Sequence, residues 1–103
     1  MASTREYLDY VLERLSGVED VRHRAMMGEY ILYHRGRVFG GVYDDRLLLK
    51  PTPSARAALT DAPMETPYEG AKPMLLADPD DARLVALVPR MYGELSDTKK
   101  RKT

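Results

Sequence analysis

The hydrophobic positions near the start of the chain repeat at intervals of three and four residues, which predicts an amphipathic helix. One face of that helix carries Tyr7, Leu8, Val11, Leu12 and Leu15. Ser3 and Glu6 have the spacing of a capping box, in which two side chains satisfy free backbone N–H groups at a helix start. Gly17 suits the left-handed residue that often follows a helix end. We therefore expect a helix over about residues 4–16 that begins at Ser3.

Between residues 22 and 50 the pattern changes to short segments rich in β-branched, aromatic and leucine residues. Gly28, Gly36 and the pair Asp44-Asp45 separate these segments and are typical turn residues. We expect strands near residues 22–27, 30–34, 37–43 and 46–50. Because each connection is too short for a parallel crossover, these strands should form an antiparallel meander.

Two-residue turns at 28–29, 35–36 and 44–45 would fix the register of this meander, because side chains alternate across a strand. One face is then apolar and should receive the helices; it carries Met26, Ile31, Tyr33, Val38, Val42, Leu47 and Leu49. The opposite face mixes aromatic and basic side chains, among them Tyr30, Arg37, Phe39, Tyr43, Arg46, Leu48 and Lys50. A β-bulge at Gly28 or at the Gly40-Gly41 pair would exchange the two faces beyond it.

The middle of the chain predicts a short helix and two irregular strands. Thr52 is a good N-cap and Pro53 suits the first helical position, so we expect a helix over residues 54–60. Three prolines, at positions 63, 67 and 73, frame two weak extended segments near 65–68 and 73–77. Proline lacks a backbone donor, so these strands should be edge-like or irregular.

The last predicted helix has clear start signals. Asp78 is its expected cap and Pro79 its first residue, while the adjacent pair Asp80-Asp81 would favour the positive end of the helix dipole. Its apolar face carries Leu84, Val88, Met91 and Leu95, widened by Leu87 and Tyr92. Pro89 lies inside and should cause a kink or a break. The fold class is therefore α+β, with two layers: an antiparallel meander sheet and N-terminal and C-terminal helices.

Composition fits one small globular domain. The chain has 103 residues, of which 44% are hydrophobic and 31% are charged, and it contains no cysteine, which excludes disulfides. The formal net charge is zero, but residues 99–102 are all basic, so residues 1–98 hold 12 basic and 16 acidic residues and carry a charge of −4. We expect a domain over residues 1–96 and a disordered basic tail over 97–103. The sequence shows no secretion signal or apolar run of membrane-spanning length, so we expect a cytoplasmic protein.

The chain lacks the phosphate-binding, dinucleotide-binding, zinc-protease and serine-hydrolase motifs, so we expect no catalytic residues, no cofactor and no metal. His23 and His34 would face each other across the first turn. Two imidazoles without a neighbouring carboxylate make a poor metal site, however, and an exposed cross-strand pair is the better interpretation. Turn chemistry likewise explains Asp44-Asp45 better than acid–base catalysis does.

Two groups of basic residues are candidates for binding. Four arginines, Arg22, Arg24, Arg35 and Arg37, are expected at one end of the first strands, either as an anion site or as a solvated rim paired with acids; we favour the rim. The aromatic and basic sheet face predicts an interface formed by Tyr30, Arg37, Phe39, Tyr43, Arg46 and Leu48. We expect a protein partner there, including a second copy of the chain. Cover by the last helix, or nucleic-acid binding through this face and the basic tail, are the alternatives.

Residues 24–50 resemble the N-terminal domain of the TfoX/Sxy competence regulators. That family typically shows R-x-M-F-G-G-Y-G-x-Y, then G-x-x-F, then D-x-L-Y-L-K. The matching residues are Arg24, Met26, Gly28, Tyr30, Tyr33, Gly36, Phe39, Asp45, Leu47 and Lys50. The sequence departs from the family at Met27, Glu29 and Leu48, where Phe, Gly and Tyr are usual. The likeness covers about residues 5–92.

The resemblance implies a two-layer α+β fold, a role in regulating transcription of DNA-uptake genes beside the cyclic-AMP receptor protein, and no catalytic residues. Two-domain regulators of this family carry a helical C-terminal domain, and we expect no such domain in this chain. We therefore expect a stand-alone, non-enzymatic protein-interaction module with a regulatory role, which contacts nucleic acid only indirectly and no membrane.

Overall fold

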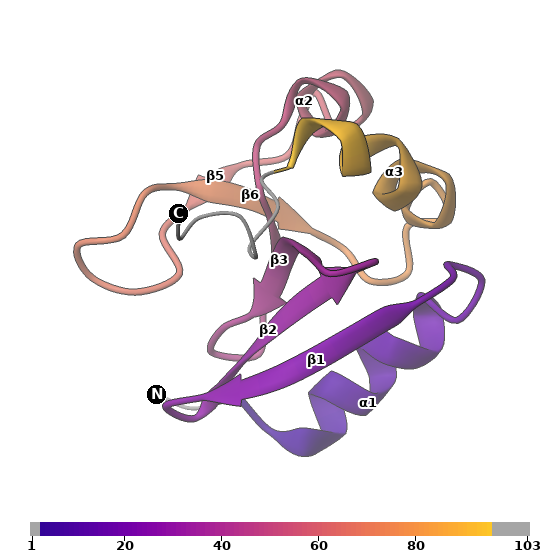
Figure 1. The fold of residues 1–103 in the computed structure, drawn as a ribbon. Coiled ribbons are helices and arrows are strands. Elements are labelled where there is room, and N and C mark those ends of the chain that lie inside the picture. Colours follow the sequence, from indigo (N-terminus) through magenta and orange to yellow (C-terminus); the bar gives the residue numbers. More distant parts are fainter. Residues whose placement is uncertain (1–2, 96–103) are drawn as a thin grey trace, which may run out of the picture.

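The computed structural model describes residues 3–95, which form a six-stranded antiparallel sheet in the order β1-β2-β3-β4-β6-β5 together with three α-helices (Figure 1). The strands are β1 (Val21–Met26), β2 (Glu29–His34), β3 (Arg37–Val42), β4 (Leu47–Leu49), β5 (Met64–Glu65) and β6 (Met74–Ala77). The helices are α1 (Arg5–Arg14), α2 (Pro53–Ala58) and α3 (Leu84–Met91), with a 3-10 turn η1 (Tyr92–Glu94) after the last. The predicted α+β class is confirmed. The tail over 97–103 lies outside the described residues.

The first helix begins one residue later than expected. Thr4 is the N-cap, and its hydroxyl accepts a hydrogen bond from the Tyr7 N–H at 3.1 Å. Ser3 cannot serve as the cap because its hydroxyl donates instead to a Glu29 carboxylate oxygen at 2.6 Å. At the other end Leu15 is the C-cap, and Gly17 does not take the predicted left-handed conformation. The hydrogen bond between Ser3 and Glu29 thus ties the start of α1 to β2 and fixes the helix against the sheet.

The first hairpin turns one residue earlier than predicted. Met27 and Gly28 both have positive φ, 53° and 87°, which is the geometry of a two-residue hairpin turn. His23 therefore lies opposite Leu32, and the predicted pairing of His23 with His34 is wrong. His34 is buried, and its Nδ1 lies 2.9 Å from the Glu19 carbonyl oxygen. Residues 3–95 contain no group of three or more side chains placed to hold a metal ion.

A β-bulge in the pairing of β2 with β3 changes which residues share a face of the sheet. Tyr33 lies opposite Val38, but Leu32 lies opposite Gly40, so Phe39 is the extra residue. The predicted faces are therefore wrong as whole sets, because they are exchanged beyond this point. The face that the helices cover, which we call the inner face, carries these strand residues in its core: Leu32, Phe39, Val42, Leu47, Leu49, Leu75 and Ala77.

The three helices bury their apolar sides in this one core. Figure 1 shows α1 running along β1 and β2, while α2 and α3 lie together near β6. Their contributions to the core cluster are Leu8, Val11, Ala55, Leu84, Leu87, Val88 and Met91. Phe39, at 0% exposure, is the largest fully buried side chain of the cluster. No helix of residues 3–95 is long and apolar enough to cross a membrane.

Two of the predicted turns and the second helix are confirmed. Gly36 has a φ of 86°, and Asp44 and Asp45 both have a φ of 54°. The Asp45 carboxylate also accepts a hydrogen bond from the Thr4 N–H at 2.8 Å, which gives this acid a structural role. At α2 the Thr52 hydroxyl accepts from the Ala55 N–H, as the cap predicts. Strand β5 is an edge, but β6 lies between β4 and β5 and is not edge-like.

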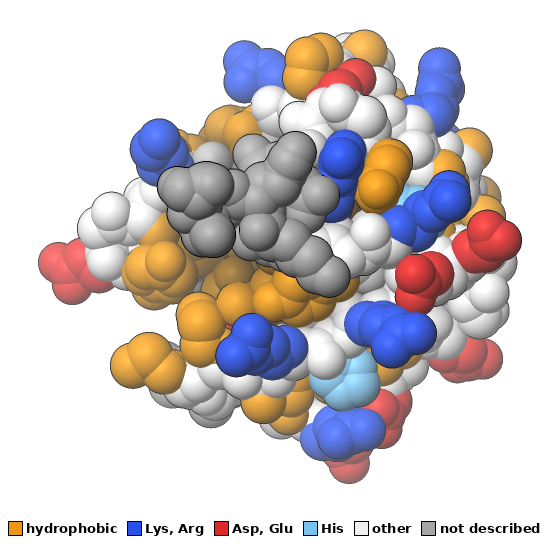
Figure 2. Space-filling model, viewed as in Figure 1, with side chains coloured by type: hydrophobic (Ala, Val, Ile, Leu, Met, Phe, Trp, Pro, Cys, Tyr) orange, Lys and Arg blue, Asp and Glu red, His pale blue; other side chains and the backbone are white. Residues whose placement is uncertain are grey.

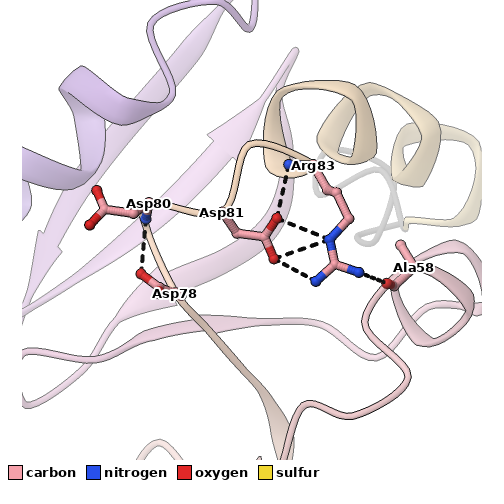
Figure 3. A network of polar contacts seen from close by, with 5 residues as sticks. All are labelled: Ala58, Asp78, Asp80, Asp81 and Arg83. Carbon is pink, nitrogen blue, oxygen red and sulfur yellow. Dashed lines mark hydrogen bonds and ion pairs between the residues drawn. The ribbon is translucent and has the colours of Figure 1, made fainter.

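The last helix begins at Leu84, six residues after the expected cap. The aspartates before it use their carboxylates to accept hydrogen bonds within turns, so these residues are not helical (Figure 3). The Asp78 carboxylate accepts from the Asp80 N–H at 3.0 Å, and Asp81 accepts from the Arg83 backbone and guanidinium. Arg83 also donates to the Ala58 carbonyl oxygen at 2.7 Å, which joins α3 to the end of α2. The predicted helix-dipole role of Asp80-Asp81 is therefore wrong. The helix continues through Pro89 to Met91 before η1 follows.

Candidate functional site

The sheet surface opposite the helices, which we call the outer face, has no described helix over it. Alternation along the paired strands places Met26, Ile31, Tyr33 and Val38 on it, and none of the four is fully buried. Met26 is 40% exposed. These residues belong to the face that the predicted register places beneath the helices. An apolar sheet surface that residues 3–95 leave without a covering helix is typical of a partner or ligand site.

A cleft with a cavity volume of about 750 Å³ opens on this face, lined by residues of β3, β5 and β6 and of the segments between the strands. Its base includes Val38 and Gly40, one side is formed by the segment from Met64 to Met74, and the other by residues 50–53 with Glu94 and Leu95. That volume lies within the range of about 300–1,000 Å³ that ligand pockets usually have. Figure 2 shows hydrophobic side chains gathered on the side of the molecule that bears β5 and the loop after it.

Arg46 holds the loop wall of the cleft in place. Its guanidinium pairs with Glu65 at 2.7 Å and donates to the carbonyl oxygens of Tyr43 at 3.1 Å and Thr66 at 3.3 Å. These contacts join β4 to β5 and to the loop that follows. A partly buried arginine with several fixed acceptors loses little further freedom, so it sets the geometry of the wall. Arg46 is therefore a positioning residue of the cleft.

Two tyrosines supply the aromatic surface of the cleft. The rings of Tyr43 and Tyr68 lie 6.2 Å apart between centroids and are tilted by 57°. Tyr43 is buried, and burial, followed by the nearby Tyr68 and Glu29, raises the pKa of its hydroxyl. Tyr68 is 58% exposed, and Met64 beside the same cleft is 44% exposed. Exposed tyrosine and methionine together offer an adaptable apolar contact surface.

Lys50 and Lys72 are the basic side chains that line the cleft. Lys50 is half-buried, and burial lowers the pKa of its ammonium group. No carboxylate within residues 3–95 forms an ion pair with it. The acid at the rim, Glu94, accepts hydrogen bonds from the Ser54 N–H at 3.0 Å and hydroxyl at 2.7 Å, which lower the pKa of its carboxyl group. The cleft thus pairs an apolar surface with an ammonium group that has no fixed counter-ion in the described chain.

The six predicted interface residues separate into two sets at the bulge. Tyr43, Arg46 and Leu48 belong to the outer face; Leu48 is fully buried there. Tyr30 packs against the inner core and Phe39 is part of it, so neither forms the predicted exposed patch. A homodimer through that patch loses its structural basis.

Arg37 does not lie on an open rim as predicted. It donates to the Tyr92 carbonyl oxygen at 2.8 Å, and its guanidinium lies 4.2 Å from the centre of the Tyr92 ring. Arg35 lies over the same ring at 5.4 Å, and Arg22 pairs with Asp20 at 2.9 Å. Of these three arginines, Arg22 is paired with an acid, as the predicted rim requires, while Arg35 and Arg37 contact Tyr92 instead.

The second wall of the cleft does not follow from the sequence pattern. Met64, Tyr68, Lys72 and Met74 all lie in the proline-framed segment that was interpreted as irregular strands. An aromatic residue and a lysine between Pro67 and Pro73 were the available signal. Periodicity cannot show that this loop folds back beside Tyr43, since that contact depends on Arg46 holding residues 65 and 66.

The architecture defines a small two-layer α+β domain, with helices on one face of an antiparallel sheet and a cleft on the other. Residues 13–85 match the family model described as the TfoX N-terminal domain. The chain belongs to this family, as the motif over residues 24–50 indicated. It is also similar to an uncharacterized 12.7 kDa protein encoded in the trpE 5′ region of Spirochaeta aurantia, with 37% identity over 78 residues, which is 76% of this chain and 68% of that protein. No solved structure matches the chain.

Proposed function

We propose that this protein is a non-enzymatic interaction module of the TfoX N-terminal type, and that its cleft binds an extended segment of a regulatory protein partner. The observation that carries this proposal is the open outer face with its cleft of about 750 Å³. The cleft walls bring Tyr43, Tyr68 and Met64 together beside Lys50, a combination of aromatic, flexible apolar and charged groups that is common at protein interfaces.

The family supports the regulatory part of the proposal. The resemblance implies a role in regulating transcription of DNA-uptake genes beside the cyclic-AMP receptor protein, and we propose that this domain contacts nucleic acid only indirectly. The charge of the domain agrees with that role, because residues 3–95 contain 12 basic and 15 acidic residues. A net negative domain is poorly suited to neutralise a nucleic-acid backbone, which supplies most non-specific affinity.

Selection from a displayed library of random twelve-residue peptides tests the proposal. We expect enriched peptides to bind the protein, and Tyr68→Ala to weaken them by about tenfold or more, because an exposed aromatic at the centre of a contact often dominates binding. The matched control is Tyr10→Ala, which removes another exposed tyrosine, from α1 on the helix side of the sheet. Peptides that bind both variants as tightly as the parent protein would contradict the proposal.

Nucleic-acid binding is the second candidate, favoured by one observation. Tyr43 and Tyr68 stand beside Lys50 and Lys72 in the same cleft, and stacking on aromatic rings next to lysines is how many proteins hold single strands. Fluorescence anisotropy with a labelled single-stranded oligonucleotide separates the candidates. Binding that falls steeply with added salt would favour this second function. We expect no saturable binding at low salt.

A further inference from the structure

We propose that Lys50 recognises a carboxylate group of the segment that occupies the cleft, so that the partner segment is acidic at one position and apolar beside it. This inference rests on the proposed function and specifies the chemistry of its ligand. It comes from three features of the structure: the fixed position of Lys50, the commitment of the acids around it to other groups, and the apolar surface of the opposite wall.

The backbone holds Lys50 firmly at the end of β4. Its N–H donates to the Phe39 carbonyl oxygen at 2.9 Å, which continues the pairing with β3 beyond Leu49. Its own carbonyl oxygen accepts from the Thr52 N–H at 2.8 Å. Alternation along β4 places the side chain on the outer face with Leu48, and it lines the cleft there. A recognition group on a fixed strand end binds with little loss of conformational freedom.

Two acids beside the cleft are already engaged. Glu65 pairs with Arg46 at 2.7 Å, and Glu94 is bound to the backbone and hydroxyl of Ser54. No ion pair of residues 3–95 involves Lys50, which is half-buried all the same. A partly dehydrated ammonium group without a counter-ion gains more from an arriving carboxylate than a fully solvated one does.

The rest of the cleft selects the neighbours of that carboxylate. Met64, Tyr68 and Met74 line the opposite wall and offer apolar contact. Lys72, which is exposed, adds a second positive charge at the loop and should speed the approach of an anionic ligand more than it adds affinity. Two lysines are enough for a segment that carries one carboxylate. A nucleic-acid backbone, by contrast, requires basic groups that neutralise several phosphates in a row.

A matched pair of small probes tests this inference. N-acetyl-leucyl-leucine carries one carboxylate, and its C-terminal amide has the same apolar side chains without the charge. Two-dimensional NMR of the full-length protein measures both dissociation constants from the amide shifts of residues around the cleft. We expect the acid to bind about tenfold more tightly than the amide, as a charge-assisted hydrogen bond allows.

Three variants locate that preference. Lys50→Met should lower the affinity for the acid to that for the amide and leave the amide unchanged, while Lys50→Arg should keep the preference for the acid. Lys72→Met is the matched control and should change the preference by less than about twofold, because exposed charges contribute little affinity. The Lys50 ammonium itself, followed by side-chain 15N NMR, should show a higher pKa when the acid is bound.

Several results would overturn the inference. Equal binding of acid and amide would show an apolar cleft without carboxylate recognition, which leaves the proposed function intact. A preference for the acid that survives Lys50→Met would assign recognition to another group. Absence of binding by either probe, or their displacement by a single-stranded oligonucleotide with a steep salt dependence, would also reject it. The proposed function fails separately, if library-selected peptides ignore Tyr68→Ala.

Discussion

The two faces of the sheet are built from the same strands and are both rich in apolar residues, yet they differ in what covers them. On the inner face Leu32, Phe39 and Leu47 are fully buried beneath the helices. On the outer face their neighbours Tyr33 and Val38 stay partly exposed. Hydrophobic content alone therefore does not decide which face receives the helices. The register does, and here one extra residue, Phe39, sets it.

The bulge reverses the alternation of side chains along β3, so that residues after it point to the opposite face from the one simple alternation predicts. Before it, β3 directs Val38 outward; after it, Val42 points into the core and Tyr43 to the cleft. A strand without the bulge would place Phe39 and Tyr43 on the same face. The bulge therefore separates the aromatic residue that builds the core from the one that lines the candidate site.

The largest expected effect compares one aromatic residue from each face. Phe39→Ala should lower the free energy of unfolding by about 3–5 kcal/mol, the usual cost of removing a buried phenylalanine ring. Tyr33→Ala removes a ring of similar size from the outer face and should cost about 1 kcal/mol, because that side chain is already partly in solvent. Urea denaturation measures both. Equal losses would mean that the two faces are covered equally well.

The second prediction concerns the close approach of β3 and β4 at the bulge. A Cβ atom added at Gly40 would collide with the Leu48 carbonyl oxygen, and that backbone atom cannot move alone. Gly40→Ala should therefore cost about 1–3 kcal/mol of stability by overpacking. Gly93→Ala is the control, because an added Cβ meets nothing within 4 Å there. If thermal unfolding shows equal melting temperatures for the two variants, the strands are not packed as described.

Much of the fold follows from local signals in the sequence. Periodicity and turn residues predicted α1, four strands and α2 within a few residues, because the Thr52 cap and the Gly28 and Gly36 turns act through their own neighbours. The start of α3 was missed because Asp81 uses its carboxylate on Arg83, a choice that helix-start rules do not reveal. The face assignment failed because a bulge is decided by packing across strands.

The candidate site was predictable only in part, because local signals place some of its residues and long-range packing places the others. Tyr43, Arg46 and Lys50 were placed together correctly, since they lie beyond the bulge in one continuous register. Tyr30 and Phe39 were assigned to the same face and belong to the core instead. Tyr68 and Lys72 were not connected with the site at all, because loop positions depend on long-range contacts such as the pair of Arg46 with Glu65.

The third prediction tests the polar contact that joins α2 and α3 on the helix side. Hydrogen bonds from Arg83 lower the pKa of the Asp81 carboxyl group, so its ionised form is stabilised in the folded state. Stability from such a group is present above its unfolded pKa and is lost as the pH falls through the folded pKa. We expect Asp81→Asn to lower the melting temperature by about 2 °C near neutral pH. The difference from the parent protein should shrink toward about pH 3. A difference that is constant with pH would assign the loss to packing.

The smallest expected change in stability has the opposite sign and falls on the outer face. Burial lowers the pKa of Lys50, so the folded protein releases this proton at a lower pH than the unfolded chain does. The charged form therefore opposes folding at neutral pH, and this cost disappears as the pH rises through the folded pKa toward the ordinary lysine value of about 10.4. Replacing the ammonium with an apolar side chain of similar length, Lys50→Met, should raise the free energy of unfolding by about 0.5 kcal/mol at neutral pH, a small gain because solvent still screens the half-exposed group.

Urea denaturation at neutral pH and near pH 10 measures this gain, which should shrink at the higher pH as the folded protein begins to release the Lys50 proton. Lys72→Met is the control and should leave stability within about 0.5 kcal/mol at both pH values, because that lysine is exposed. A less stable Lys50→Met protein would mean that the lysine supports the fold through its own contacts. A more stable one would show that the outer face keeps a charge which folding does not require, as a group retained for binding a carboxylate would be.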